Sequence, residues 1–170
     1  MLTIGQAVSA EDFRQVQLLL AEYFEFLRTD VDTTLDDLDT VPTTAGYREE
    51  IADLPGRYAP PAGRLLLARY ADEPAGCIAF YQFGVGVCEV KRLWVRPQFR
   101  GKKVGRALVE KLIAEAYHCG YREMILSTVD ILKEAHELYR SLGFEPTEPF
   151  FTLPPAMMEH EIFLKRPLTV

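Results

Sequence analysis

Apolar and polar positions in the first quarter of the chain follow two different periods. Residues 2–8 alternate loosely between the two kinds of side chain, which predicts an edge strand. Ser9 and Asp12 have the spacing of a capping box and therefore mark the start of a helix. Apolar residues then recur every three or four positions, so we expect an amphipathic helix over 10–28. The acidic, threonine-rich stretch 29–44 contains a proline and predicts no regular element.

The middle of the chain carries strand patterns separated by turn residues. A short helix over about 45–53 and a loop rich in proline and glycine over 54–63 lead into it. Three apolar segments follow, joined by hairpin-sized turns, and they predict strands over 64–70, 75–83 and 87–95. We therefore expect an antiparallel meander at the centre of the fold.

The last third combines two helical patterns with further strands. We expect helices over 104–119 and 133–142, with Gly120 as the left-handed C-cap of the first and Gly143 ending the second. The remaining apolar segments predict strands over 123–129, 144–147 and 157–164. The whole order indicates an α/β fold in a single domain, residues 1–170. Its central sheet is mixed and mostly antiparallel, with about seven strands flanked by about four helices on both faces.

Composition and charge narrow the range of functions. The 170-residue chain is 48% hydrophobic and 26% charged, as globular proteins are, and no apolar run approaches the roughly 20 residues of a membrane span. Its net charge of −6 argues against nucleic-acid binding. The three cysteines (Cys77, Cys88 and Cys119) fit no metal-binding spacing. We expect reduced thiols, no metal, no signal peptide and a cytoplasmic location.

Positive charge is concentrated in one stretch of this acidic chain. Residues 91–111 hold eight basic residues and one acid, and two glycines, Gly101 and Gly105, lie among them just before and within a predicted helix start. The first amides of a helix lack internal partners and carry partial positive charge, so this stretch predicts a phosphate or diphosphate site. The spacing excludes a P-loop and a GxGxxG dinucleotide fingerprint.

Two motifs together resemble the Gcn5-related N-acetyltransferase (GNAT) superfamily. The segment VKRLWVRPQFRGKKVGRAL resembles the family pattern [RQ]-x-x-G-x-[GA], and AHELYRSLGFEP resembles its ALYxxxGF segment. Arg100 and Gly105 fill the ends of the first pattern, whereas Lys103 replaces its middle glycine. The resemblance implies a GNAT-like fold and acetyl-CoA as the donor of an acetyl group.

The resemblance also implies where acetyl-CoA would bind. The backbone of the fourth strand would pair with the pantetheine arm, and the loop and helix start would hold the phosphates with backbone amides and basic side chains. The implied cofactor-binding residues are Leu93, Trp94, Val95, Arg100, Gly101, Lys102, Lys103, Val104, Gly105, Arg106, Ala135 and Tyr139.

Two residues are candidates for the chemistry. The resemblance makes Tyr139 the acid that protonates the departing CoA thiolate; periodicity alone makes it a core residue. Glu89 on the fourth strand is the candidate base for the amine, and the alternative is a structural ion pair with Lys91 or Arg92. We expect Cys88 and Phe83 to lie in the core.

The acceptor is expected to be a small-molecule or peptide amine of unknown identity. The aspartates of 30–39 would attract a cation, or they are an ordinary solvated run. Five aromatic residues are candidates for lining the acceptor pocket: Tyr23, Phe26, Tyr47, Phe150 and Phe151. A homodimer is one assembly that the family suggests. The alternative function is a non-catalytic acyl-CoA-binding sensor or interaction module, which the Lys103 departure favours.

Overall fold

The computed structural model describes residues 1–31 and 45–169, with the side chains of Asp30 and Val31 left aside. Seven strands form one sheet in the order β1-β2-β3-β4-β5-β7-β6. Only β4 and β5 run parallel; the other neighbours are antiparallel. The strands are β1 (Leu2–Gln6), β2 (Arg64–Tyr70), β3 (Glu73–Gly84), β4 (Val87–Val95), β5 (Glu123–Val129), β6 (Glu145–Pro146) and β7 (Glu161–Pro167). The expected mixed, mostly antiparallel sheet is confirmed.

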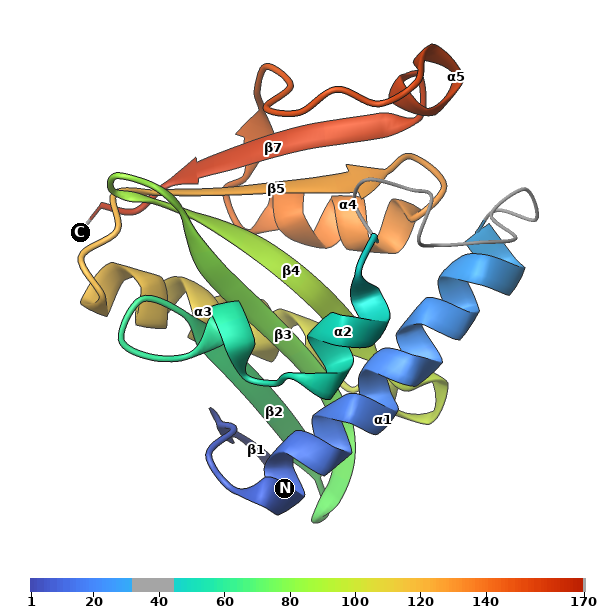
Figure 1. Cartoon of the computed structure of the whole chain (residues 1–170), viewed down its shortest axis with the longest axis vertical. Coiled ribbons are helices and arrows are strands. Elements are labelled where there is room, and N and C mark those ends of the chain that lie inside the picture. The colour runs from blue at the N-terminus through green and yellow to red at the C-terminus, as the bar shows by residue number, and fades with distance from the viewer. Residues whose placement is uncertain (32–44, 170) are drawn as a thin grey trace.

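Helices cover both faces of the sheet (Figure 1). Two of them, α1 and α2, lie across one face of β2, β3 and β4, while α3 and α4 lie on the other face. The helices are α1 (Ala10–Phe26), α2 (Tyr47–Ala52), α3 (Val104–His118), α4 (Lys133–Ser141) and α5 (Pro155–Met158). A π-helical turn, Leu27–Val31, continues α1, and 3-10 turns occupy Gly56–Tyr58 and Pro97–Phe99. Among the described residues, no helix has the length and apolar character needed to cross a membrane.

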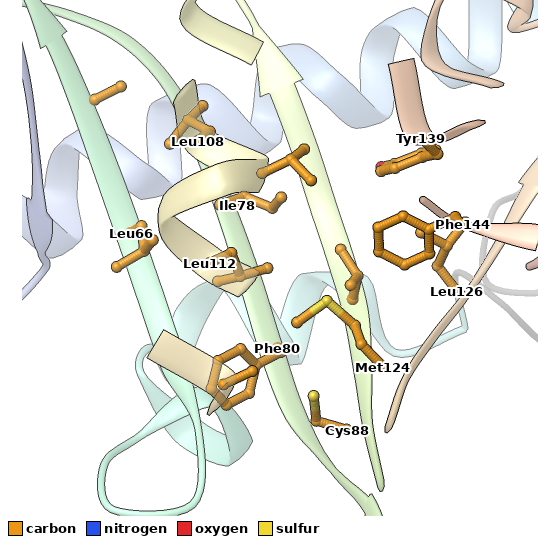
Figure 2. Close-up of a cluster of buried hydrophobic side chains, with 14 of the residues drawn as sticks. Leu66, Ile78, Phe80, Cys88, Leu108, Leu112, Met124, Leu126, Tyr139 and Phe144 are labelled. Carbon is orange, nitrogen blue, oxygen red and sulfur yellow. The ribbon is translucent and has the colours of Figure 1, made fainter. Parts of the chain in front are cut away.

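Two hydrophobic cores fill the spaces between these layers. Leu65, Leu67 and Cys77 point to the α1 side, whereas the alternate residues of the same strands point to α3. Figure 2 shows the larger α3-side core, which runs from Leu66 and Phe80 to Tyr139 and Phe144. The chain therefore fixes β4 on both faces, which matters because β4 borders the candidate site.

Local signals in the sequence identify the element ends well. The capping box at Ser9 and Asp12 is present, with the amide nitrogen of Asp12 3.0 Å from the Ser9 hydroxyl oxygen. Gly120 and Gly143 follow α3 and α4 with φ angles of 89° and 90°, as expected of left-handed helix ends.

Three expectations were wrong. The last strand covers 161–167 rather than 157–164, because Pro154 and Pro155 begin the short helix α5, which ends in a turn just before it. The preceding strand is reduced to Glu145–Pro146. Phe83 is 45% exposed and not in the core, because it lies near the end of β3 in neither of the two cores and instead contacts the Phe150 ring.

Candidate active site

The edge of β4 that faces β5 is open over most of its length. The two strands pair in parallel only from Val87 to Glu89, opposite Glu123 to Ile125. Beyond that point β4 is paired on its other side alone, where Trp94 lies opposite Cys77. Figure 1 shows β4 and β5 separating from this end. An extended ligand can therefore form main-chain hydrogen bonds with the free edge of β4.

A β-bulge turns β4 at the start of this open edge. Lys91 lies opposite Ala79 and Trp94 opposite Cys77, so two residues of β4 stand against one residue of β3. Arg92 is the first of the two, and its φ of 65° is in the left-handed region. The bulge is thus located where the strand leaves β5, between the predicted base Glu89 and the predicted cofactor residues.

The loop that follows β4 presents free amides. Gly101 and Lys103 have φ angles of 77° and 62°, and Lys103 precedes the first residue of α3. The amide of Lys102 donates to the Phe99 carbonyl at 3.3 Å. Within the described ranges, the amides of 103–106 donate to no protein group. They are therefore available to an anion at the positive end of the helix.

The predicted cationic side chains surround this loop, but several also contact the protein. The Arg100 guanidinium lies 5.2 Å from the Trp94 ring centroid. Lys102 Nζ lies 4.6 Å from the Tyr70 ring centroid. Arg106 donates to the Ser141 hydroxyl of α4 at 2.7 Å. These contacts position three cations without neutralising them, since none of these partners is acidic; Arg106 alone also has an exposed partner, Glu110 at 3.4 Å.

Tyr139 lies on α4 beside the separated strands. Its side chain is 6% exposed and contacts the Phe144 ring edge to face, with centroids 5.5 Å apart. Burial raises the pKa of the Tyr139 phenol, with a smaller contribution from Tyr23, so the hydroxyl keeps its proton at neutral pH. Its oxygen bonds to no other described residue. Ala135, one turn earlier, packs against the same core.

Glu89 is buried and fully engaged on the α1 side of the sheet. It is 3% exposed, accepts a hydrogen bond from the Tyr81 hydroxyl, and lies 3.0 Å from Lys91 Nζ. Burial lowers the pKa of Lys91, whereas the charge of Glu89 opposes that shift. The structural ion pair that the sequence offered as an alternative is therefore present.

A second ionic network was missed at the sequence level. Glu50 of α2 lies 2.7 Å from Arg92 Nε and 2.9 Å from Arg57, and the Tyr58 hydroxyl also donates to it at 2.9 Å. The Arg92 guanidinium also lies 4.9 Å from the Phe24 ring centroid. No local motif marks this network, because its members come from three segments that only the fold brings together.

Glu161 was also missed. It is the first residue of β7, opposite Val129, the last residue of β5. It is partly buried and accepts a hydrogen bond from the Ser127 hydroxyl. Burial raises the pKa of Glu161 to about 6, and the Ser127 hydrogen bond and the charge of Lys91 only partly oppose this. A carboxyl group on an isolated glutamate gives no signal in the sequence.

The five aromatic candidates for the acceptor pocket fall into two groups. On the α1 side, the rings of Tyr23 and Phe26 lie 5.9 and 5.2 Å from the Trp94 ring. Tyr47 lies with them, 4.6 Å from Phe24. The second group, Phe150 and Phe151, packs on Phe163 of β7 at 5.1 and 4.8 Å. Most of the aspartate run lies outside the described residues.

The fold and this geometry define an α/β protein with an extended site between two diverging strands and an anion site at its end. Residues 22–144 match the model of the acetyltransferase (GNAT) family, and the chain belongs to that family. The expected resemblance is confirmed.

Individual proteins show the same relationship. An uncharacterized N-acetyltransferase of Schizosaccharomyces pombe is 36% identical over 155 residues, which cover 90% of this chain and 88% of its own length. The fold is similar to PaiA N-acetyltransferase of Thermoplasma acidophilum in complex with coenzyme A, at 14% identity, a TM-score of 0.74 and coverage of 98% and 99%. It is also similar to yncA of Salmonella typhimurium with acetyl-CoA, at 18% identity, a TM-score of 0.71 and coverage of 100% and 95%.

Proposed function

We propose that this protein transfers the acetyl group of acetyl-CoA directly to a primary amine. The observation that carries this proposal is the open edge of β4, which leads to the free amides of 103–106 at the start of α3. The pantetheine arm contains two amides and pairs with a strand edge as a peptide does. The diphosphate then reaches the positive end of α3. Family membership and the coenzyme A complexes of two fold relatives support the same ligand.

The residues present fit a polyanionic donor. Arg100, Lys102 and Lys103 are exposed around the amides, and Arg106 is held beside them by Ser141 of α4. Leu93, Trp94 and Val95 would border the arm from β4, with Ala135 across from them on α4. Lys103 takes a left-handed conformation that glycine adopts freely, so the lysine does not prevent the turn into the helix.

Acetyl transfer needs one group that gives a proton and one that takes a proton. As the amine nitrogen bonds to the acetyl carbon, the carbon–sulfur bond breaks and Tyr139 gives its phenolic proton to the sulfur. The high pKa of Tyr139 keeps this proton in place until the thiolate forms in the same low-dielectric surroundings. The proton of the amine goes to a carboxylate on the α1 side, where Glu89 is the residue that the sequence predicts.

The test is release of CoA thiol from acetyl-CoA by the purified protein, followed with a chromogenic thiol reagent. The amines would be phenethylamine, spermidine, L-lysine and an alanine-initiated peptide, each against a reaction without amine. Amine-dependent release would support the transferase. Calorimetric binding of acetyl-CoA, weaker for CoA without its 3′-phosphate, together with no release for any amine, would instead favour the non-catalytic binding module. The acceptor, a homodimer and the cytoplasmic location stay predictions.

A further inference from the structure

Glu161 faces the opening between β4 and β5 from the β7 side. It is paired with Val129, and Ser127 lies two residues earlier on β5, so both side chains are on one face of the sheet. Lys91 approaches the same space from β4, because its charge acts on Glu161. Lys91 is on the α1 face, opposite buried Ala79. The Glu161 carboxyl group therefore lies on the face where the acceptor amine would arrive.

Tyr23 of α1 links Glu161 to the predicted acid. Its phenol interacts electrostatically with Glu161, and it also contributes to the electrostatic environment of Tyr139. Tyr139 belongs to α4 on the opposite side of the sheet, so the two interactions meet through the gap between the strands. A proton acceptor at Glu161 and a proton donor at Tyr139 thus lie on either side of one side chain.

The two glutamates of this face differ in their partners. Glu89 is held by Tyr81 and by the ammonium of Lys91 at 3.0 Å. Glu161 has the Ser127 hydroxyl as its one hydrogen-bond donor, and within the described residues it has no ion pair. A carboxylate that neutralises a buried lysine loses that interaction on taking a proton, whereas Glu161 does not.

We infer that Glu161 is the general base of the acetyl transfer, rather than Glu89. The carboxylate takes the proton that leaves the amine nitrogen, directly or through one water, as the nitrogen–carbon bond forms. The carbon–sulfur bond breaks and the sulfur takes the Tyr139 proton. Solvent then removes the proton from Glu161 and returns one to Tyr139. The inference rests on the proposed function and names a residue for one of its steps.

The charged and titratable groups around Glu161 define the expected pH dependence. These groups are Lys91 from β4 and Tyr23 from α1, with the Asp130–His160 pair at the adjoining ends of β5 and β7. Because burial places the pKa of Glu161 near 6, the base is charged above that pH and is lost as the pH falls through it.

The experiment measures kcat/KM from pH 5 to 9 with acetyl-CoA and the most active amine of the four named above. The variants are Glu161→Gln, Glu89→Gln and, as a matched control, Glu159→Gln, which alters an exposed glutamate two residues away. We expect Glu161→Gln to lower kcat by roughly 10²–10⁴-fold at pH 7 and to remove the acidic limb near pH 6. Its activity should then follow the free-amine concentration upward with pH. Calorimetric binding of acetyl-CoA should be unchanged.

Each result has one meaning. Retention of the acidic limb and of near-normal kcat by Glu161→Gln would overturn the inference while leaving the transferase intact. Loss of that limb in Glu89→Gln instead would give the role to Glu89. Wild-type protein that releases no thiol with any amine would overturn the proposed function, and this inference with it. Weakened acetyl-CoA binding by Glu161→Gln would indicate a structural role and would also contradict the proposal.

Discussion

Arg92 on β4 and Glu50 on α2 form a buried ion pair that fastens the short helix α2 to the bulge of the site strand. The Arg92 Nε atom lies 2.7 Å from a Glu50 carboxylate oxygen, although 42 residues separate them in the chain. The side chains are 5% and 15% exposed. Since Arg92 begins the bulge, the pair connects the acceptor-side helix to the strand edge that would hold acetyl-CoA.

Breaking this pair should be costly. We expect Glu50→Gln to lower the free energy of unfolding by about 3 kcal/mol at pH 7, because it leaves the Arg92 guanidinium buried without its counter-charge. Urea denaturation measures the change. Glu11→Gln, which breaks an exposed pair with Arg14, is the control and should change stability little. Equal effects of the two substitutions would contradict a structural role for the buried pair.

The same pair should make stability depend on acid pH. Burial raises the pKa of Glu50, but the hydrogen bond and charge of Arg92 outweigh it, so the pKa lies below its usual 4.5. The pair's contribution is therefore complete above about pH 4.5 and is lost as the pH falls through the lower pKa of the folded state. Wild-type and Glu50→Gln stabilities, measured by urea denaturation from pH 3 to 7, should converge on acidification. A constant difference would contradict this assignment.

Tyr139→Phe tests the predicted acid with little change in packing. The ring can keep its contact with Phe144, so the melting temperature and the acetyl-CoA dissociation constant should be nearly unchanged. Loss of the proton donor should lower kcat by roughly 10²–10⁴-fold in the thiol-release assay. Tyr117→Phe, at a tyrosine of α3 that is 42% exposed, is the control. A kcat within threefold of wild type would remove Tyr139 from the chemistry.

The sequence predicted the parts of this fold that depend on local chemistry. The capping box at Ser9, the left-handed glycine after α3 and the three central strands follow from short-range patterns. The last strand was misplaced because the two methionines before it are apolar, although Pro155 starts a helical turn there. Phe83 was misjudged because composition does not show which strand ends the helices cover.

The site was predictable only where a motif carries it. The loop from Arg100 to Arg106 and the ALYxxxGF-like segment could be read in the sequence. Glu161 could not, because its surroundings come from the pairing of β5 with β7 and from α1. The partner of Glu89 was foreseen because Lys91 is two residues away on the same strand. Long-range pairs such as Arg92 with Glu50 need the fold itself.

Lys103 should be replaceable by glycine with a gain in stability. A residue with a side chain at φ 62° costs about 1 kcal/mol, and glycine avoids this at a somewhat smaller entropic cost. We expect Lys103→Gly to raise the free energy of unfolding by a few tenths to 1 kcal/mol. Lys102→Gly is the matched control and should lower it, because Lys102 has no such φ. A loss of stability in Lys103→Gly would show that the lysine is stabilised by its own contacts.

Gly76 of β3 permits the close approach of β4 at the far end of the open edge. A Cβ atom there would lie 2.5 Å from the Trp94 carbonyl oxygen and 3.3 Å from Leu108 Cδ1, so Gly76→Ala must push the strands apart. We expect a loss of about 1–3 kcal/mol of stability in urea denaturation. Calorimetry should also show weaker acetyl-CoA binding, because Trp94 and Val95 belong to the predicted cofactor site.

Gly84→Ala provides the comparison in the same strand, because a Cβ atom at Gly84 has no neighbour within 4 Å. It should leave both stability and acetyl-CoA binding close to wild type. If Gly76→Ala lowers stability but binds acetyl-CoA normally, the end of β4 is not a ligand-binding edge. If it weakens binding at temperatures where the variant is fully folded, the position of β4 against β3 determines how the site receives its ligand.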